Sequence, residues 1–446
     1  LQARKQGVTT MRIAIVGAGI AGLAAGYRLK KANLEPVIFE SASFAGGRMS
    51  SLTVDGFVLD KGAYTIPESH IFFLELLHEL GLSNQLVETP GTSSTFLKGV
   101  EHRMKIGSPT DFLKYKLIGM KDKKNLMKLF IYARALGKSL NLSEPTEKTL
   151  QLEKETVSDY LLREYSPELL EQIAYPMFAD LFLGSPEGNS KAAFLATLRN
   201  LTHFKIYTLS RGMGTLTEKL KTMLDVRLDT PVIRIGHGKE KGVFHVETGG
   251  NTPTSHAFDK IIFAVPATTI PKLFADFPPS LSNGLERVHY TPSIVVAVAL
   301  SKPCPGNSMM NTFTRKEFQA LATVVLDRYK GEARIPKGTG LATAILTAHM
   351  SERLLREPDS VVARTALTEM ASLWPGLREN VLFTRVFRWS HAGVQLPPGT
   401  LKAQKAMRNE LESRFRDLAV AGDGLHRASM EVSLRTGYRA ADHILA

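Results

Sequence analysis

The chain has 446 residues, 43% of them hydrophobic, and a formal net charge of +13 at pH 7. These values indicate a globular protein of two or three domains with sizeable cores. The single cysteine, Cys304, excludes an internal disulfide framework and favours a reducing, cytoplasmic location. No apolar run of about 18 residues is present, so we expect no membrane-spanning helix. Residues 1–10 are polar, and we interpret them as an expression remnant before a natural start at Met11.

The first predicted elements form a βαβ unit. An apolar strand over 11–16 runs into a glycine-rich turn, a helix follows, and a second strand closes on Glu40. The first glycine permits the tight turn, the second lets the backbone approach a pyrophosphate, and the third lets the helix pack closely on the sheet. The pattern therefore predicts a dinucleotide, with its pyrophosphate at the positive end of the helix. The residues expected to contact it here are Gly17, Gly19, Ile20, Ala21 and Gly22.

Glu40 and a second glycine turn narrow the choice of dinucleotide. Glu40 lies 23 residues after Gly17, where a carboxylate can accept hydrogen bonds from ribose hydroxyls and disfavours the 2′-phosphate of NADP. Arg48, on the second turn, offers a cationic fork beside the pyrophosphate. VIFE, then GGRM with a following serine, then DxG resembles the FAD-binding start of the flavin amine oxidase superfamily, which includes monoamine oxidases, protoporphyrinogen oxidases and phytoene-desaturase-like enzymes. The resemblance implies FAD, contacted also by Gly46, Gly47, Arg48 and Gly62.

A basic segment follows this unit. Residues 98–150 contain twelve Lys or Arg and five Asp or Glu, and apolar residues interleave with lysines between 112 and 131. A basic amphipathic helix can lie on an anionic membrane surface or attract an acidic substrate, but an ordinary solvated helix face has the same pattern. We keep both alternatives. A contact with an anionic membrane surface would place the protein peripherally at the inner face of a membrane. Nucleic acid is not an expected partner, because no helix-turn-helix, zinc or RNP pattern accompanies the charge.

The rest of the chain alternates between sheet and helix. Strands are expected at 232–235, 243–248 and 260–266, with a hairpin between the first two, and a second sheet is expected from Tyr290 onward. We expect an α/β fold that combines a Rossmann-type FAD-binding domain with a substrate domain of mixed sheet plus helices, similar to amine oxidases and protoporphyrinogen oxidases. The expected pieces are 11–95, 206–280 and 401–446 for the FAD-binding domain, 96–205 for a helical region and 281–400 for the substrate sheet.

A second motif lies near the C-terminus. Gly422 and Asp423 end an apolar strand, and a helix begins near Glu431 and Val432. This resembles the superfamily's signature of AGD, MEGA and SGxxAA, although Val432 stands where glycine is usual. The resemblance implies that Asp423 binds the ribityl or phosphate region and that backbone amides near Glu431 and Val432 face the flavin. It also implies that the backbone of Val232 meets the adenine.

The expected substrate pocket departs from that of simple amine oxidases. Alignment places Val295 where those enzymes carry a lysine, and Ser429 and Ala392 where they carry two aromatic residues that flank the amine. Loss of these rings removes the faces that would hold an amine cation. No catalytic side chain and no metal ligand is assigned, because the expected chemistry is centred on the flavin. The candidate pocket residues are Tyr64, Trp389, His391 and Gln395.

These features predict an FAD-dependent oxidase or dehydrogenase that is similar to protoporphyrinogen oxidases. We expect hydride transfer to flavin N5 from a hydrophobic substrate such as a porphyrinogen-like molecule, and the substrate is either acidic or uncharged. Oxygen or a quinone is the expected electron acceptor. Three alternatives stay open. They are an amine or natural-product oxidase of the same superfamily, a polyene desaturase or isomerase, and a non-catalytic flavin-holding protein that binds a membrane surface or a partner.

Overall fold

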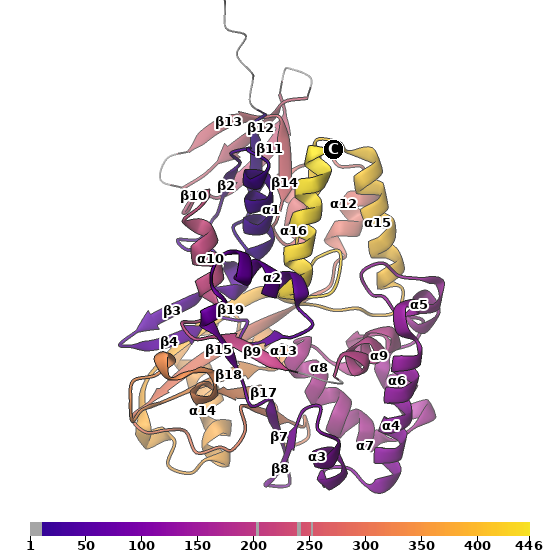
Figure 1. Cartoon of the computed structure of the whole chain (residues 1–446), viewed down its shortest axis with the longest axis vertical. Coiled ribbons are helices and arrows are strands. Elements are labelled where there is room, and N and C mark those ends of the chain that lie inside the picture. Colours follow the sequence, from indigo (N-terminus) through magenta and orange to yellow (C-terminus); the bar gives the residue numbers. More distant parts are fainter. Residues whose placement is uncertain (1–10, 202–204, 239–241, 251–252) are drawn as a thin grey trace, which may run out of the picture.

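The computed structural model describes residues 11–446 apart from 202–204, 239–241 and 251–252, so the interpretation of residues 1–10 lies outside the described residues. Figure 1 shows a sheet with flanking helices in the upper part of the molecule, and a larger sheet beside a cluster of helices in the lower part. Within the described part of the chain, no helix combines the length and the apolar character needed to cross a bilayer.

The upper part is built on a five-stranded parallel sheet. β1 is buried along its whole length, as expected for an apolar run at the centre of a parallel sheet. The strands come from residues between 13 and 420, so distant pieces of the chain meet in one sheet. Their order is β10 (Asp225–Arg227), β2 (Val37–Phe39), β1 (Ile13–Val16), β14 (Lys260–Phe263) and β20 (Leu418–Val420).

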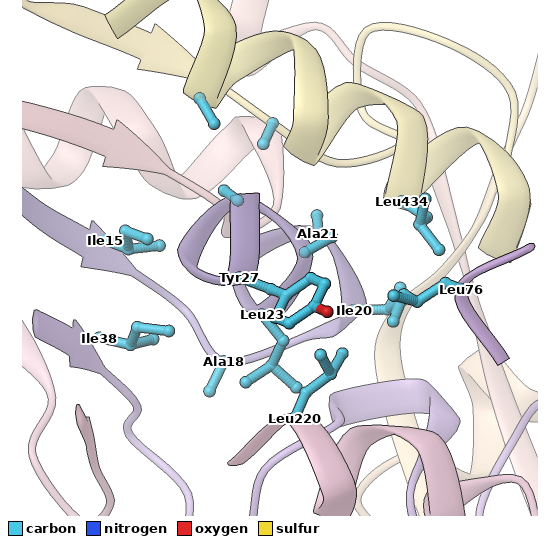
Figure 2. Packing of buried hydrophobic residues seen from close by; sticks show 14 of the residues in the cluster. Ile15, Ala18, Ile20, Ala21, Leu23, Tyr27, Ile38, Leu76, Leu220 and Leu434 are labelled. Atoms are coloured by element: carbon cyan, nitrogen blue, oxygen red, sulfur yellow. The ribbon is translucent and has the colours of Figure 1, made fainter. Parts of the chain in front are cut away.

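Helix α1 (Ile20–Lys31) packs between this sheet and the C-terminal helix α16 (Met430–Leu445). Figure 2 shows Ile15 and Ile38 of the sheet on one side of α1 and Leu434 of α16 on the other. The two helices approach closely, since a Cβ at Gly437 would lie 2.3 Å from the carbonyl oxygen of Ala21. The predicted Rossmann-type unit is therefore confirmed.

The opposite face of the parallel sheet packs against a three-stranded antiparallel sheet of β11 (Val232–His237), β12 (Phe244–Thr248) and β13 (Thr254–Phe258). β11 and β12 are the predicted hairpin. Phe39 of β2 meets Phe258 of β13 edge to face, with ring centroids 5.9 Å apart. Both faces of the parallel sheet are thus covered, as such sheets require.

The lower part contains a seven-stranded mixed sheet covered by α14 (Asp359–Leu373). β19 and β15 form its longest pair, which extends to the parallel-sheet half of the molecule. The sheet order is β19 (Val381–Val394), β15 (Tyr290–Leu300), β18 (Gly340–Leu346), β17 (Leu321–Leu326), β16 (Met310–Phe313), β7 (Thr92–Leu97) and β8 (Val100–Lys105).

One sequence-based boundary does not match this sheet. The expected boundary between residues 95 and 96 falls inside β7, which pairs in parallel with β16 from the expected substrate domain. The hairpin of β7 and β8 was not expected, because Thr92–Leu97 is polar and lacks the alternation of apolar residues that indicates a strand. Long-range pairing with β16 stabilises it instead.

The helical cluster includes most of the basic segment, in α3 (Pro109–Lys114) and α4 (Met120–Ala135). One face of α4 is buried against α9 (Lys191–Asn200), whereas Met127 and Ile131 on α4 remain exposed. Helices α6 (Val157–Glu164) and α8 (Tyr175–Leu181) lie in the same cluster. The other principal elements are β3 (Ser51–Val54), β4 (Phe57–Asp60), β5 (Ile66–Pro67), β6 (Leu86–Glu88), β9 (Ile206–Leu209), α2 (Ile71–Glu79), α5 (Glu147–Leu152), α7 (Pro167–Leu169), α10 (Gly214–Lys221), α11 (Ile270–Leu273), α12 (Pro279–Glu286), α13 (Ala348–Leu354) and α15 (Thr400–Arg414).

Candidate active site

A cavity of about 800 Å³ is lined by residues of both the parallel sheet and the seven-stranded sheet. Gly17, Glu40 and Val232 line it from the parallel-sheet half, and Val295 and Trp389 line it from β15 and β19. A nucleotide bound along the first group would therefore share one cavity with a substrate bound against the second.

The three glycines after β1 have different roles. Gly17 has φ of +106°, and a Cβ there would lie 2.6 Å from the carbonyl oxygen of Ala264. A Cβ at Gly22 would lie 1.9 Å from the carbonyl oxygen of Gly17, so this glycine allows α1 to pack on the turn. A Cβ at Gly19 would meet no protein atom within 4 Å, and Gly19 lines the cavity together with Ile20 and Ala21. Gly19 thus leaves open the space that a pyrophosphate would take at the N-terminus of α1.

Glu40 lies at the cavity wall at the end of β2. Its Oε2 accepts a hydrogen bond from the backbone N–H of Ala18 at 2.8 Å, and its Oε1 accepts one from Ala42 at 2.9 Å. These bonds hold the carboxylate beside the glycine turn. Pro231 and Val232 line the same cavity, so a ribose at Glu40 and an adenine at Val232 both fit the residues present.

Arg48 joins the N-terminal and C-terminal motifs. Its Nη1 lies 2.8 Å from Oδ2 of Asp423 and its Nη2 donates to Oδ1 at 2.9 Å, which is a bidentate pair. Nη1 also donates to the carbonyl oxygen of Ala392 at 2.6 Å. Burial opposes the charge, but Asp423 outweighs it and raises the pKa of Arg48. Asp423 is only 5% exposed, so this ion pair fixes two distant segments in one wall.

Backbone geometry around Arg48 explains the neighbouring glycines. Gly46 and Gly422 have φ of +96° and +108°, which side chains rarely adopt. A Cβ at Gly62 would lie 2.5 Å from the carbonyl oxygen of Arg48. Gly46, Gly47, Gly62 and Gly422 all line the cavity.

The start of α16 differs from expectation in its side chains. The Glu431 carboxylate accepts hydrogen bonds from the backbone N–H groups of Phe72 at 3.1 Å and Phe73 at 3.0 Å, so it caps α2. Glu431 and Val432 are absent from the described cavity wall, which Ser429, Met430 and Ser433 line instead. The contact of the Glu431 and Val432 amides with the flavin therefore stays a prediction, and it involves only the backbone.

Three of the four candidate pocket residues line the cavity: Tyr64, Trp389 and His391. Trp389 donates from Nε1 to the carbonyl oxygen of Lys61 at 2.7 Å. His391 lies 3.1 Å from Thr268 Oγ1, and burial, with the charges of Arg48 and Lys272, lowers its pKa. It is therefore a neutral imidazole near pH 7.

Gln395 is the exception and does not line the cavity. It is 2% exposed, and its Nε2 donates to the Phe182 carbonyl oxygen at 3.0 Å while its Oε1 accepts from Asn189 Nδ2 at 2.8 Å. Gln395 therefore connects β19 to the helical cluster. Its amide groups are used by the protein and are not free for a substrate.

Val295, Ala392 and Ser429 all line the cavity. They are the residues expected from the sequence to stand where simple amine oxidases carry a lysine and two aromatic residues. The wall at these positions offers an isopropyl, a methyl and a hydroxyl group, none of which attracts a cation as an aromatic face does.

Sequence reasoning missed three charged residues of the wall, Asp180, Arg388 and Arg427. Asp180 accepts a hydrogen bond from the Tyr64 hydroxyl at 2.6 Å, and burial raises the pKa of Asp180 to about 6 although this bond opposes the shift. A signal for Asp180 was available, because it is an acidic residue inside an otherwise apolar helix, Tyr175–Leu181. Arg427 lies in the loop before α16, where no motif marks it.

The fold and the cavity define a flavoprotein oxidoreductase with a Rossmann-type cofactor site. A profile of the flavin containing amine oxidoreductase family matches residues 20–445, and the chain belongs to that family. The family places the chain among the FAD-dependent oxidoreductases and makes FAD its cofactor. The glycine turn, Glu40 and the Arg48–Asp423 pair fit that cofactor.

Curated relatives are similar at low identity. The chain is 26% identical to mitochondrial protoporphyrinogen oxidase of Nicotiana tabacum over 54% of the chain and 46% of that protein. It is 26% identical to L-amino-acid oxidase of Gloydius blomhoffii over 65% of the chain and 59% of that protein. These two alignments span about half of each relative's length. Protoporphyrinogen oxidase 2 of Arabidopsis thaliana aligns over 99% of the chain and 95% of that protein at 21% identity.

Solved structures share the fold. A protein of Exiguobacterium that is provisionally named protoporphyrinogen oxidase superimposes with a TM-score of 0.79 at 19% identity, covering 98% of this chain and 99% of the other. Cyclohexylamine oxidase of Brevibacterium oxydans superimposes with a TM-score of 0.74 at 18% identity, covering 98% of each chain. The predicted fold class is confirmed, and the substrate is left open because neighbours with different donors share it.

Proposed function

We propose that this chain oxidises a carbon–hydrogen bond of a hydrophobic small molecule, with FAD along the glycine turn and the donor against β15 and β19. When bound, FAD supplies a two-electron acceptor that takes a hydride at N5. The observation that supports the proposal is that one cavity is lined both by the nucleotide-binding residues and by an apolar wall of the seven-stranded sheet.

In this proposal the protein positions the donor and excludes water. Val295, Ile345, Phe182 and Leu183 give the substrate side of the cavity an apolar surface. Such a surface holds a flat or extended apolar molecule in one orientation, and positioning of the reacting carbon accounts for much of the barrier lowering in such reactions. Oxygen or a quinone is the proposed final acceptor.

A porphyrinogen-like donor is favoured over an amine. Val295, Ala392 and Ser429 leave the wall without the lysine and aromatic cage of simple amine oxidases, and protoporphyrinogen oxidases are among the relatives. An amine or amino-acid-derived donor is the second candidate, because L-amino-acid oxidases are also among the relatives.

Anaerobic bleaching of the bound flavin tests the proposal. The holoenzyme is mixed with protoporphyrinogen, L-amino acids, primary amines or a polyene, and flavin absorbance is followed. We expect bleaching by the porphyrinogen and none by the amines. Bleaching by amines alone would favour the second candidate, and bleaching by the polyene alone would favour a desaturase. Stable FAD that no donor bleaches would favour a non-catalytic flavin-holding protein.

We also propose that α3 and α4 contact an anionic membrane surface. Leu113, Met120, Met127 and Ile131 are 63%, 61%, 44% and 62% exposed, and exposed lysines of α4 lie among them. Apolar side chains can enter the headgroup boundary while lysines meet anionic lipids.

Vesicle flotation checks the membrane contact. The triple change Lys121→Gln, Lys124→Gln and Lys128→Gln is expected to lower binding to vesicles with anionic lipid by about tenfold or more, since each lysine near such a surface contributes roughly 1 kcal/mol. A control with Lys219→Gln, Lys316→Gln and Lys337→Gln removes the same charge from other exposed positions. Equal loss in both variants, or no binding by the unmodified protein, would contradict a contact through α3 and α4.

A further inference from the structure

Three arginines line the cavity, and they differ in their partners. Arg48 pairs with Asp423 at 2.8 Å, and Arg388 pairs with Asp359 at 2.6 Å. Arg427 has neither an ion pair nor a hydrogen bond to any residue that the structure describes. Its guanidinium is therefore the one cationic group of the described cavity wall whose charge the protein leaves unbalanced.

The surroundings of Arg427 make this imbalance costly. Its side chain is half-buried, and burial together with the nearby charge of Arg199 lowers its pKa. Removal of a charge from water is unfavourable unless an opposite charge or hydrogen bonds replace the water. A second cation nearby adds repulsion, so the protein maintains a positive potential at this part of the wall.

The neighbouring polar groups are suited to an anion as well. Burial, followed by the charge of Arg427, lowers the pKa of His70 to about 3, so this imidazole is neutral near pH 7 and carries no charge of its own. His70 Nε2 lies 3.4 Å from the Ser429 hydroxyl, and both residues line the cavity. His70 Nδ1 is buried without a hydrogen-bond partner among the described residues. A bound anion could accept from the Ser429 hydroxyl while it pairs with Arg427.

The other anion-binding features of the cavity are already assigned. The pyrophosphate fits the N-terminus of α1 and the Arg48 region, which lie at the glycine turns. Asp180, the acidic residue of the substrate side, is hydrogen-bonded to Tyr64. Neither feature supplies the counter-charge for Arg427.

We propose that Arg427 and the Ser429 hydroxyl form a subsite for a carboxylate of the substrate. The inference rests on the proposed function and narrows it, because it makes the donor an apolar molecule that carries a carboxylate. Acid recognition is thereby placed in the cavity wall and not on the exposed lysines of α4. A guanidinium is well suited to this task, since its planar fork can donate two parallel hydrogen bonds to one carboxylate.

Binding of octanoate, compared with octanol, tests the subsite without turnover. Both probes have the same apolar chain, and only the first has a negative charge at neutral pH. Their affinities for the FAD-loaded protein are measured by titration calorimetry and by perturbation of flavin absorbance. We expect octanoate to bind at least about tenfold more tightly than octanol, because hydrogen bonds to charged groups have that magnitude.

Arg427→Met is expected to remove this preference and to leave octanol binding unchanged. Arg427→Lys is expected to keep part of it, since the charge remains and the fork is lost. Arg435→Met is the matched control: it removes the same charge from an exposed position of α16 outside the cavity wall and should preserve the preference. FAD affinity and thermal unfolding of each variant show that the fold is retained, and Arg427→Lys replaces Arg427→Met if the latter does not fold.

Two results would overturn the inference. One is an octanoate preference that is absent in the unmodified protein or persists in both Arg427 variants. The other is a loss of FAD affinity in Arg427→Met with octanoate binding intact, which would assign the guanidinium to the cofactor. Either result leaves the donor screen unaffected. Failure of every donor in that screen, with octanoate binding normal, would instead remove the proposed function and leave the subsite.

Discussion

The most unusual single residue of the cavity wall is Asp180. It is 8% exposed, Lys330 lies 5.5 Å from the ring centroid of its partner Tyr64, and the Tyr64 hydroxyl donates to it at 2.6 Å. A carboxyl group whose pKa burial raises to about 6 changes protonation within the range in which enzymes work. Its charge would then act on whatever occupies the cavity.

A pH titration of the bound flavin is expected to report Asp180. Below about pH 6 Asp180 is protonated and neutral, and above it the carboxylate is charged, so flavin absorbance should show a step near that pH. Asp180→Asn should abolish the step. Tyr64→Phe should move the step to higher pH. The hydrogen bond from the Tyr64 hydroxyl stabilises the charged carboxylate of Asp180, and this variant lacks it. An unchanged step in Asp180→Asn would assign the titration to another group.

At the scale of elements, the contact of α1 with the turn that precedes it determines the geometry of the cofactor site. Gly22 lacks a side chain where α1 packs on the turn, and Gly437 lacks one where α16 packs on α1. Gly19 lacks one where α1 faces the cavity. The same residue type therefore allows close packing at two positions and leaves cavity space open at the third.

Two alanine substitutions should separate these roles. Gly22→Ala forces a Cβ to 1.9 Å from the Gly17 carbonyl oxygen and should destabilise the FAD-free protein by roughly 1–3 kcal/mol, as overpacking does. Gly19→Ala meets no protein atom and should cost about 1 kcal/mol or less, yet lower FAD affinity tenfold or more by filling the pyrophosphate space. Thermal unfolding and FAD titration measure the two effects. Equal effects on stability would contradict the assignment.

At the scale of the whole molecule, a fully buried group of four charges connects the two halves. Asp60 of β4 lies 2.7 Å from Arg334 and 3.4 Å from Lys330, and Asp327 lies 2.8 Å from Lys330. Met213 and Ser51 add hydrogen bonds to Asp60. Burial opposes ionisation of Asp60, but Arg334 and Lys330 outweigh it and lower its pKa.

Arg334→Met should destabilise the protein by about 3–5 kcal/mol, because it leaves the two buried carboxylates of Asp60 and Asp327 with Lys330 as their single cation among the described residues. Arg28→Met, which removes the exposed Arg28–Asp442 pair, should cost about 1 kcal/mol or less. Since the folded-state pKa of Asp60 is lowered, its stabilisation is present above about pH 4 and is lost as the pH falls further. Urea unfolding at neutral pH measures the costs of the two variants, and equal costs would contradict the first prediction. Urea unfolding at acidic pH measures the loss of stabilisation by Asp60.

The sequence alone was sufficient to predict the cofactor and the segments expected to bind it. The glycine spacing, Glu40, Arg48 and the Gly422–Asp423 motif are local backbone and charge requirements, so they can be recognised without knowledge of the fold. Three pocket residues could also be selected from the sequence. Tyr64 lies shortly after the second glycine turn, and Trp389 and His391 belong to a strand that the sequence predicts.

Only the tertiary structure decided the composition of the substrate side. It brings Asp180 from the helical cluster and Arg427 from the loop before α16 into one wall, moves β7 and β8 into the large sheet, and buries Gln395 outside the cavity. These outcomes depend on contacts between residues far apart in the chain. Burial and the presence or absence of a charged partner, which determine what Asp180 and Arg427 can do, exist only after those contacts form.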